Sequence, residues 1–340
     1  MSGGFDVSGG GDVGGDAGGA PAVEVRDLVR EYVQRVPAGR FRRRRVVVRA
    51  VDGLSLRIGR GESVGFIGAN GAGKSTTVKL LTGILVPTAG TVRTCGLDPA
   101  ARRRELARRV GVVFGQRSQL WWDLPLAESF RLLGAIHGLP GARRRARLDD
   151  LVERLDLGGF LATPVRQLSL GQRMRGEVAA ALLHSPELLL LDEPTIGLDV
   201  LSSERLRRFL RAERAERGTT LLLTTHDMVD VQRLCERVLV VDSGRLAYDG
   251  DLPGLARRVG ARRVLVVDLR EPAAPLRAPG AELVSVEGDG LRQRLAFDPA
   301  TTTAAAVLAA VSRVAEVRDL SVEEPDVADV VRQLHASARR

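Results

Sequence analysis

Aromatic residues and cysteines are scarce in this chain. Aromatic residues make up 4% of the 340 residues, and the two cysteines are Cys95 and Cys235. Neither cysteine has metal-ligand spacing or a histidine partner nearby, so the sequence predicts neither a zinc site nor a disulfide framework. Ordinary packing in a reducing compartment accounts for both thiols.

Long apolar runs are also missing. The longest, around Leu188–Leu191 and Val238–Val241, have the length of a strand, whereas a membrane helix needs about 20 apolar residues. The first residues do not combine a charged start with an apolar stretch, so no signal peptide is expected. We therefore expect a chain that, if it serves a membrane, does so from outside the bilayer.

Arginine, in contrast, is abundant. Lys and Arg together number 51 against 42 Asp and Glu, and the formal net charge is +9. Nearly all basic residues are arginines, with runs at Arg42–Arg45, Arg102–Arg104 and Arg143–Arg145. A basic balance favours acidic partners such as nucleotides, nucleic acid or anionic lipid. For each run, a solvated loop or helix face is the alternative interpretation.

The sequence pattern divides the chain into three parts. Residues 1–22 are glycine-rich and predict a disordered tail, because they cannot bury enough apolar surface to offset the entropy of ordering. From 23 to 253, short apolar strands alternate with helical stretches, which indicates an α/β domain with a largely parallel sheet. Within it, residues from about 117 to 175 predict an inserted helical subdomain. Residues 263–340 predict a small C-terminal α+β accessory domain.

The α/β domain contains one expected interruption near its start. Pro37 to Arg45 combine proline, glycine and consecutive arginines and predict a loop or insertion. The expected strands are Val46–Val48, Leu54–Ile58, Ser63–Ile67, Val110–Phe114, Leu188–Leu191, Thr220–Thr224 and Val238–Val241.

The strongest chemical signal is a glycine-rich segment that fits G-x-x-x-x-G-K-[ST] in full. It follows an apolar strand and opens a helix, which is the context that a phosphate-binding loop requires. Its glycines allow backbone amides to point at phosphate oxygens, and the helix N-terminus adds a favourable dipole. Lys74 then neutralises the outer phosphates and the Ser75 hydroxyl ligates Mg²⁺. The predicted ATP-binding residues are Gly68, Ala69, Asn70, Gly71, Ala72, Gly73, Lys74, Ser75 and Thr76.

A second signal is the acidic pair Asp192 and Glu193, which follows four leucines. Such a leucine run predicts a strand buried on both faces, and a carboxylate at its carboxyl end lies where α/β sheets bind ligands. Asp192 can hold Mg²⁺ through water, and Glu193 can act as the general base toward the attacking water. Strand alternation predicts that the two carboxylates diverge.

With these motifs, the chain resembles the ATP-binding subunits of ABC transporters. Leu168 to Gln172 resembles the family's signature motif and precedes the acidic pair, as in the family. By this resemblance Gln116 matches the Q-loop glutamine that also contacts the metal, and Asp199 matches the D-loop aspartate. His226 matches the switch histidine, and Tyr32 matches the aromatic residue that stacks on adenine. The resemblance covers residues 23 to 253.

The resemblance also implies partners. In ABC ATPases two nucleotide domains dimerise head to tail, so Ser169, Gly171 and Gln172 would contact ATP held by the partner, a second copy or a paralogous subunit. Leu170 departs from the common pattern, which has glycine there. Trp121 and Trp122 lie where the family contacts its membrane subunit, although core packing is the alternative. A separate multi-spanning permease, a peripheral position on the cytoplasmic face of the membrane and no nucleic-acid partner are expected.

Three functions remain open at this point. The segment from Phe114 to Pro125 and the signature region resemble bacterial drug, sodium and viologen exporter ATPases. An importer ATPase would share every nucleotide motif, but its C-terminal domain is often larger. A non-transport ABC ATPase acting on nucleic acid or ribosomes is compatible with the positive net charge. However, those proteins carry two ATPase domains in one chain or long coiled coils, and this sequence shows neither. We therefore expect an exporter ATPase that uses ATP and Mg²⁺.

Overall fold

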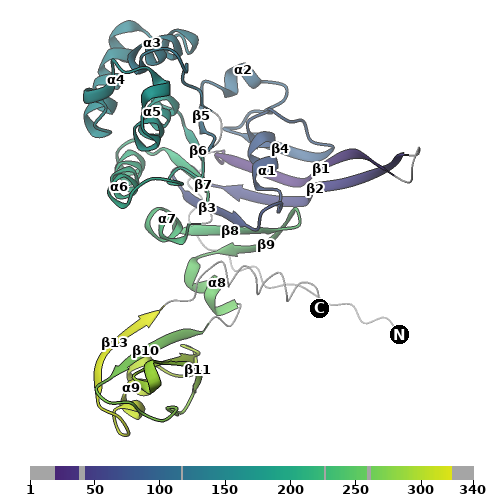
Figure 1. The fold of residues 1–340 in the computed structure, drawn as a ribbon. Coiled ribbons are helices and arrows are strands. Elements are labelled where there is room, and N and C mark those ends of the chain that lie inside the picture. Colours follow the sequence, from purple (N-terminus) through teal and green to yellow (C-terminus); the bar gives the residue numbers. More distant parts are fainter. Residues whose placement is uncertain (1–19, 38–42, 116–117, 226, 259–261, 324–340) are drawn as a thin grey trace, which may run out of the picture.

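The computed structural model describes residues 20–37, 43–115, 118–225, 227–258 and 262–323. A six-stranded sheet forms the centre, in the order β5-β6-β7-β3-β8-β9 (Figure 1). Its first five strands are parallel, and β9 pairs antiparallel to β8. The strands are β5 (Val110–Val113), β6 (Leu188–Asp192), β7 (Thr220–Thr224), β3 (Ser63–Gly68), β8 (Arg237–Asp242) and β9 (Arg245–Gly250).

A second, antiparallel sheet has the order β2-β1-β4. It shares one apolar core with helix α1 (Lys74–Leu81) and with the central sheet. Its strands are β1 (Val23–Pro37), β2 (Arg43–Ile58) and β4 (Ala89–Thr94). Strands β1 and β2 form a long hairpin that projects from the molecule (Figure 1).

The prediction of a loop from Pro37 to Arg45 is wrong at both ends of that segment. Pro37 ends β1, and Arg43 to Arg45 are the first residues of β2, which runs without a break through both segments expected as separate strands. These arginines are exposed, so their charges stay hydrated and strand pairing costs no desolvation. Residues 38–42 lie outside the described residues.

Helices cover the central sheet, and three of them gather at one end of it (Figure 1). These are α3 (Leu126–Ile136), α4 (Gly141–Arg154) and α5 (Leu170–Leu182), within and beyond the segment expected to be helical. Their apolar faces share one buried core with β6 and β7. The other helical elements are α2 (Arg103–Leu106), η1 (Gly158–Phe160), η2 (Val165–Gln167), α6 (Val200–Arg217) and α7 (Met228–Leu234).

The C-terminal part forms its own α+β unit after α8 (Leu252–Arg258). Four antiparallel strands lie in the order β11-β12-β10-β13 around the helix α9 (Ala304–Val311) and have a separate apolar core. The strands are β10 (Arg263–Leu269), β11 (Ala281–Glu287), β12 (Arg292–Phe297) and β13 (Val317–Glu323), with a short η3 (Gly288–Gly290). Most of the N-terminal tail expected to be disordered lies outside the described residues.

Across the described residues, no helix is long and apolar enough to cross a membrane.

Candidate functional site

Three neighbouring parallel strands bring the predicted site residues to one edge of the central sheet. Gly68 ends β3, Asp192 ends β6, and Thr224 ends β7, which lies between them. Carboxyl ends of parallel strands meet at the same edge, where open α/β sheets bind ligands. The fold therefore places the glycine-rich loop and the acidic pair on either side of Thr224.

The loop from Gly68 to Lys74 depends on its glycines. Gly71 and Gly73 have φ angles of 84° and 104°, which side chains rarely adopt. A Cβ on Gly73 would also collide with the Ala50 carbonyl oxygen of β2, and one on Gly68 with the Val241 carbonyl oxygen of β8. The loop is thus a tight turn between two sheets, and its N-cap residue Gly73 starts α1.

Lys74 is folded back over this loop. Its Nζ donates hydrogen bonds to the carbonyl oxygens of Gly68 at 2.7 Å and Ala69 at 3.1 Å. Burial lowers the pKa of Lys74, while the nearby carboxylates of Glu193 and Asp192 oppose that shift. Ser75 follows in the first turn of α1 and is exposed. A cation on the loop and an accessible hydroxyl beside it suit a polyphosphate.

The acidic pair has two different backbone settings. Asp192 is the last residue of β6, and its carboxylate accepts a hydrogen bond from the Thr224 hydroxyl. Glu193 lies beyond the strand with a φ of 53°, and its amide donates to the Thr224 carbonyl oxygen at 2.8 Å. Strand alternation therefore does not apply to Glu193, which lies beyond the strand, and the divergence of the two carboxylates stays a prediction. A non-glycine residue held at positive φ is a strained geometry that often marks functional sites.

The predicted signature residues start helix α5. Ser169 is its N-cap, and the Ser169 hydroxyl accepts from the Gln172 amide at 3.2 Å. The Gln172 side chain in turn accepts from the Ser169 amide at 2.9 Å, which completes a capping box. The N-terminus of α5 is thereby fixed, and its dipole favours an anion there.

The start of α5 also contacts the D-loop of the same chain. A Cβ on Gly197, at a φ of 70°, would lie 2.5 Å from a methyl group of Leu170, so these two residues are in close contact. Gly171 faces Ser202 of α6. Asp199 caps α6: its carboxylate accepts from the Ser202 amide at 2.9 Å and hydroxyl at 2.6 Å, which lowers the Asp199 pKa. Leu170, the departure from the family pattern, thus fills the space above Gly197.

Tyr32 lies in β1 and is half-buried. It pairs with Val48 of β2, and the Arg30 guanidinium lies 4.9 Å from its ring centroid. Ala50, two residues beyond Val48, faces Gly73 of the loop. Tyr32 therefore lies on the antiparallel sheet, whose strand β2 contacts the glycine-rich loop from Gly68 to Lys74.

Two predicted residues, Gln116 and His226, lie outside the described residues. Ser118 and Gln119 are hydrogen-bonded to a carboxylate that sequence analysis did not single out: Glu177 of α5 accepts from the Ser118 hydroxyl and from the Gln119 amide at 3.2 Å. The Gln119 side chain donates back to the Glu177 carbonyl oxygen at 3.0 Å. Burial raises the pKa of Glu177. In the sequence, the one indication of this role is that Glu177 is an acidic residue on an otherwise apolar face of the helix.

A buried polar group behind the acidic pair was also missed. Asp230 of α7 is fully buried; it accepts from the Thr195 hydroxyl and from Arg207 Nε at 2.7 Å. Burial raises the Asp230 pKa despite these partners. The group ties the segment after Glu193 to α6 and α7. No spacing rule in the sequence connects these three residues.

Comparison with known proteins agrees with this geometry. A family profile described as "ABC transporter" matches residues 51–196. The daunorubicin resistance ATP-binding protein DrrA3 of Streptomyces coeruleorubidus is 37% identical over 300 residues, which cover 86% of this chain and 93% of that protein. This chain belongs to the ABC transporter ATP-binding proteins.

Other relatives of this ABC ATPase point the same way. ABC transporter ATP-binding protein NatA of Bacillus subtilis is 36% identical, with 64% of this chain and 87% of that protein covered. The Nod factor export ATP-binding protein I of Ralstonia nicotianae is 40% identical, with 71% and 75% covered. A solved ATP-binding subunit of an ABC transporter superposes with a TM-score of 0.60 at 28% identity, covering 71% of this chain and 94% of that one. The protein is thus an ATP-binding subunit with the ATPase activity of its family.

Proposed function

We propose that this ABC ATPase powers an exporter whose membrane path is a separate permease. The support is that relatives named for daunorubicin resistance and for Nod factor export match most of the chain. The DrrA3 match covers 86% of the chain and so must extend past Gly250 into the C-terminal unit. An importer or a non-transport ATPase would share the nucleotide site, but no relative named here favours either.

The observation that carries the ATP-hydrolysing role is that Lys74, Asp192 and Glu193 gather beyond the carboxyl ends of β3 and β6, on either side of β7. Residues 68–76 would hold the phosphates, with Lys74 neutralising their charge. Glu193 would take the proton of the attacking water. Tyr32 would stack on adenine. Gln116 and His226 would complete the site next to Asp192 and the γ-phosphate, as the family resemblance implies.

The donor set at this edge suits Mg²⁺. The Ser75 hydroxyl and the Asp192 carboxylate are hard oxygen ligands, with Gln116 as a further candidate. Among the described residues no group of three or more His, Cys, Asp or Glu could form an all-protein cage. Mg²⁺ typically keeps waters and binds substrate phosphates in addition to one or two carboxylates, so two or three protein ligands suffice. The ion would neutralise charge on the phosphates.

A head-to-tail dimer would complete each ATP site. The solved structure of MJ0796, a bacterial ABC transporter cassette of 27% identity, is dimeric; it has a TM-score of 0.58, with 68% of this chain and 98% of that one covered. At the capped start of α5, Ser169, Gly171 and Gln172 would contact a phosphate of the ATP that the second subunit holds. Asp199 at the D-loop would lie near the same interface.

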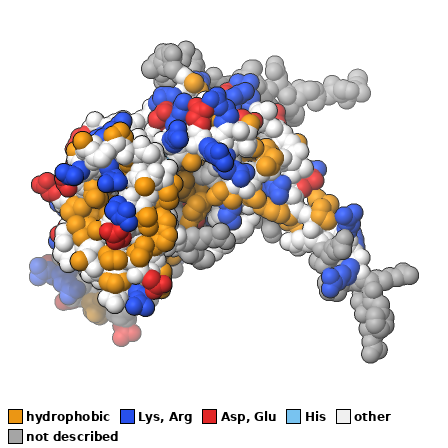
Figure 2. All heavy atoms as spheres, turned by 90° about the horizontal axis from the view of Figure 1, so that it is seen from above, with side chains coloured by type: hydrophobic (Ala, Val, Ile, Leu, Met, Phe, Trp, Pro, Cys, Tyr) orange, Lys and Arg blue, Asp and Glu red, His pale blue; other side chains and the backbone are white. Residues whose placement is uncertain are grey.

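The permease would bind the helical part of the chain at the cytoplasmic face of the membrane. Trp121 and Trp122 are 36% and 51% exposed, and Ile136 is 67% exposed. Figure 2 shows apolar side chains among basic ones on the face seen from above these helices. The Arg173 guanidinium lies 5.7 Å from the centroid of the Trp122 ring. Exposed tryptophans suit a protein contact.

Membrane attachment tests the transport role. The full chain, co-expressed with the six-helix permease encoded nearest to it, should sediment with membranes, and replacing Trp121 and Trp122 by alanine should release it. A matched control replaces the exposed Val284 and Val286 of β11 by alanine. Sedimentation that survives the tryptophan replacements would refute this docking surface, and release by both pairs would show a general loss of folding.

A further inference from the structure

An arginine-lined cavity lies between three helical elements, away from the strand ends that form the nucleotide site. Its volume is about 230 Å³. It is lined by Arg154, Leu155 and Asp156 at the end of α4, Arg175 of α5, and Arg205, Leu206, Arg208, Phe209 and Ala212 of α6. The lining thus includes four arginines and one acidic residue, and this excess of basic side chains favours an anionic occupant.

Two of these arginines are sunk into the protein. The Arg175 side chain is 13% exposed; its Nη1 donates to the carbonyl oxygens of Leu155 and Asp156, both at 2.9 Å, and to the Asp156 carboxylate at 3.2 Å. Its Nε is buried and has no hydrogen-bond partner in the described part of the chain. A buried guanidinium with an unmet donor costs free energy unless a ligand or water satisfies it.

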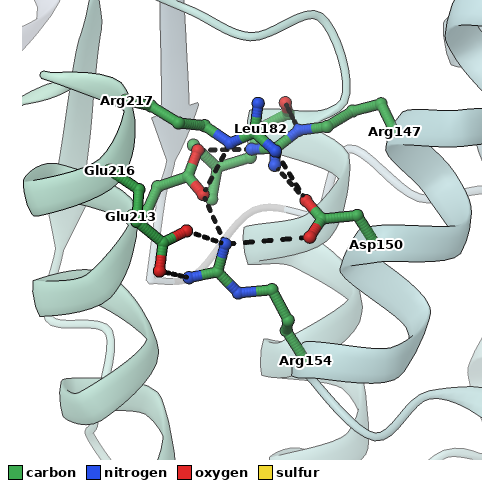
Figure 3. A network of polar contacts seen from close by, with 7 residues as sticks. All are labelled: Arg147, Asp150, Arg154, Leu182, Glu213, Glu216 and Arg217. Carbon is green, nitrogen blue, oxygen red and sulfur yellow. Dashed lines mark hydrogen bonds and ion pairs between the residues drawn. The ribbon is translucent and has the colours of Figure 1, made fainter.

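Arg154 joins the cavity to an ion-pair network between α4 and α6 (Figure 3). Its guanidinium lies over the Phe209 ring at 5.1 Å and contacts Glu216 at 2.8 Å and Glu213 at 3.7 Å. These glutamates and Asp150 at 3.7 Å balance the charge of Arg154, and none of them lines the cavity. The cavity side is left to the remaining three arginines and Asp156.

The two other arginines stand at the rim. Arg205 is 63% exposed and contacts Asp156 only at 3.6 Å, while Arg208 is exposed and makes no ion pair within the described ranges. Both residues line the cavity and are exposed, so their guanidiniums can contribute contacts to an anion at its rim. Asp156 is the acidic partner of Arg205, and Arg208 has none among the described residues.

We propose that this cavity binds a compact phosphate-class anion of about the size of pyrophosphate. Its volume lies below the range of about 300–1,000 Å³ that is usual for larger organic ligands, which favours a small anion. Arginine forms bidentate contacts to phosphate, and the tetrahedral oxygens of phosphate point in several directions at once. The donors here come from α4, α5 and α6, so such an anion would bridge three helices, including the helix that starts at Ser169.

Calorimetric titration of the full chain with pyrophosphate tests this site. Because the phosphate-binding loop can also take pyrophosphate, the titration is repeated with Lys74→Ala. Saturable binding should persist in Lys74→Ala and weaken by about tenfold or more in an Arg205→Ser, Arg208→Ser chain, since charge-assisted contacts are lost. The matched control is Arg103→Ser with Arg104→Ser, which removes two exposed arginines of α2 that make no ion pair in the described residues.

Each other outcome overturns the proposal. Binding that Lys74→Ala abolishes and the Arg205, Arg208 pair leaves intact belongs to the nucleotide site. Equal weakening by both arginine pairs is a general effect of net charge. Citrate that binds as tightly as pyrophosphate would refute the phosphate assignment, and a lack of saturable heat in every chain would remove the site. All variants must retain the wild-type unfolding temperature, which separates lost binding from lost folding.

Discussion

The stacked pair His137 and His184 predicts that this domain loses stability in mild acid. The ring centroids lie 4.1 Å apart with planes 5° from parallel, at the end of α3 and just after α5. His184 Nε2 lies 3.2 Å from the Val110 carbonyl oxygen, so the neutral ring donates there. Its Nδ1 is buried without a hydrogen-bond partner in the described residues. Protonation would place an N–H at a position that has no acceptor.

The magnitude follows from the pKa values. Burial, with a smaller contribution from His137, lowers the pKa of His184 from 6.5 to about 4. Burial and then Arg108 also lower the pKa of His137. Between these values the unfolded chain binds a proton that the folded chain does not, so stability falls as pH drops from about 6.5 toward 4. The full difference is about 3 kcal/mol, of which about 2 kcal/mol is lost by about pH 5.

Urea unfolding of His184→Gln at several pH values measures this contribution. Glutamine keeps a donor for Val110 but does not titrate. Tryptophan fluorescence is the probe, because both tryptophans, Trp121 and Trp122, precede α3 in the same helical part. The wild-type free energy of unfolding should fall by about 2 kcal/mol more than that of the variant on going from about pH 7.5 to about pH 5. Parallel profiles for wild type and His184→Gln would refute the reasoning.

Three further predictions concern single side chains. Tyr32→Ala should weaken ATP binding by about 1–3 kcal/mol while Tyr32→Trp preserves it, as equilibrium titration would show, because stacking on the base is lost only in the first. Glu177→Ala should lower stability by about 1–3 kcal/mol and Glu177→Gln by less, since only alanine leaves the Ser118 and Gln119 donors without an acceptor; denaturant midpoints check this. Arg147→Ala should cost about 3–5 kcal/mol in thermal or urea unfolding, because it leaves the fully buried Glu213 with its main ion pair broken (Figure 3). Removing both charges by Arg147→Met with Glu213→Leu should cost less; an equal cost would contradict the desolvation argument.

The fold class was predictable because its signals are local. The leucine run of β6 and the apolar strand before Gly68 are continuously apolar, and such strands are typical of a parallel sheet with both faces covered. The extended hairpin was not predictable, since Arg43 to Arg45 discourage a strand when neighbours are unknown, and pairing with β1 decides it. Strands such as β4 and β11 carry weak alternation and were missed for the same reason.

The site shows a similar division. Motif spacing predicts Lys74 and Asp192 as site residues, because packing alone seldom explains a glycine-rich turn or a carboxylate at the end of a buried strand. Glu177 and Asp230 escaped because their partners lie on other elements, and only the fold brings them together. The backbone of Glu193 was mispredicted because strand alternation was extended one residue past the end of β6.

The most direct test of the central claim is Glu193→Gln in the full chain. Glutamine keeps the shape of the side chain and removes the general base, which typically contributes about 10²–10⁴-fold in rate. The variant should bind ATP normally, hydrolyse it about 10²-fold or more slowly, and elute as a dimer with ATP on size-exclusion chromatography, while Lys74→Ala stays monomeric. Turnover close to that of the wild type, or a monomer at saturating ATP, would contradict the account.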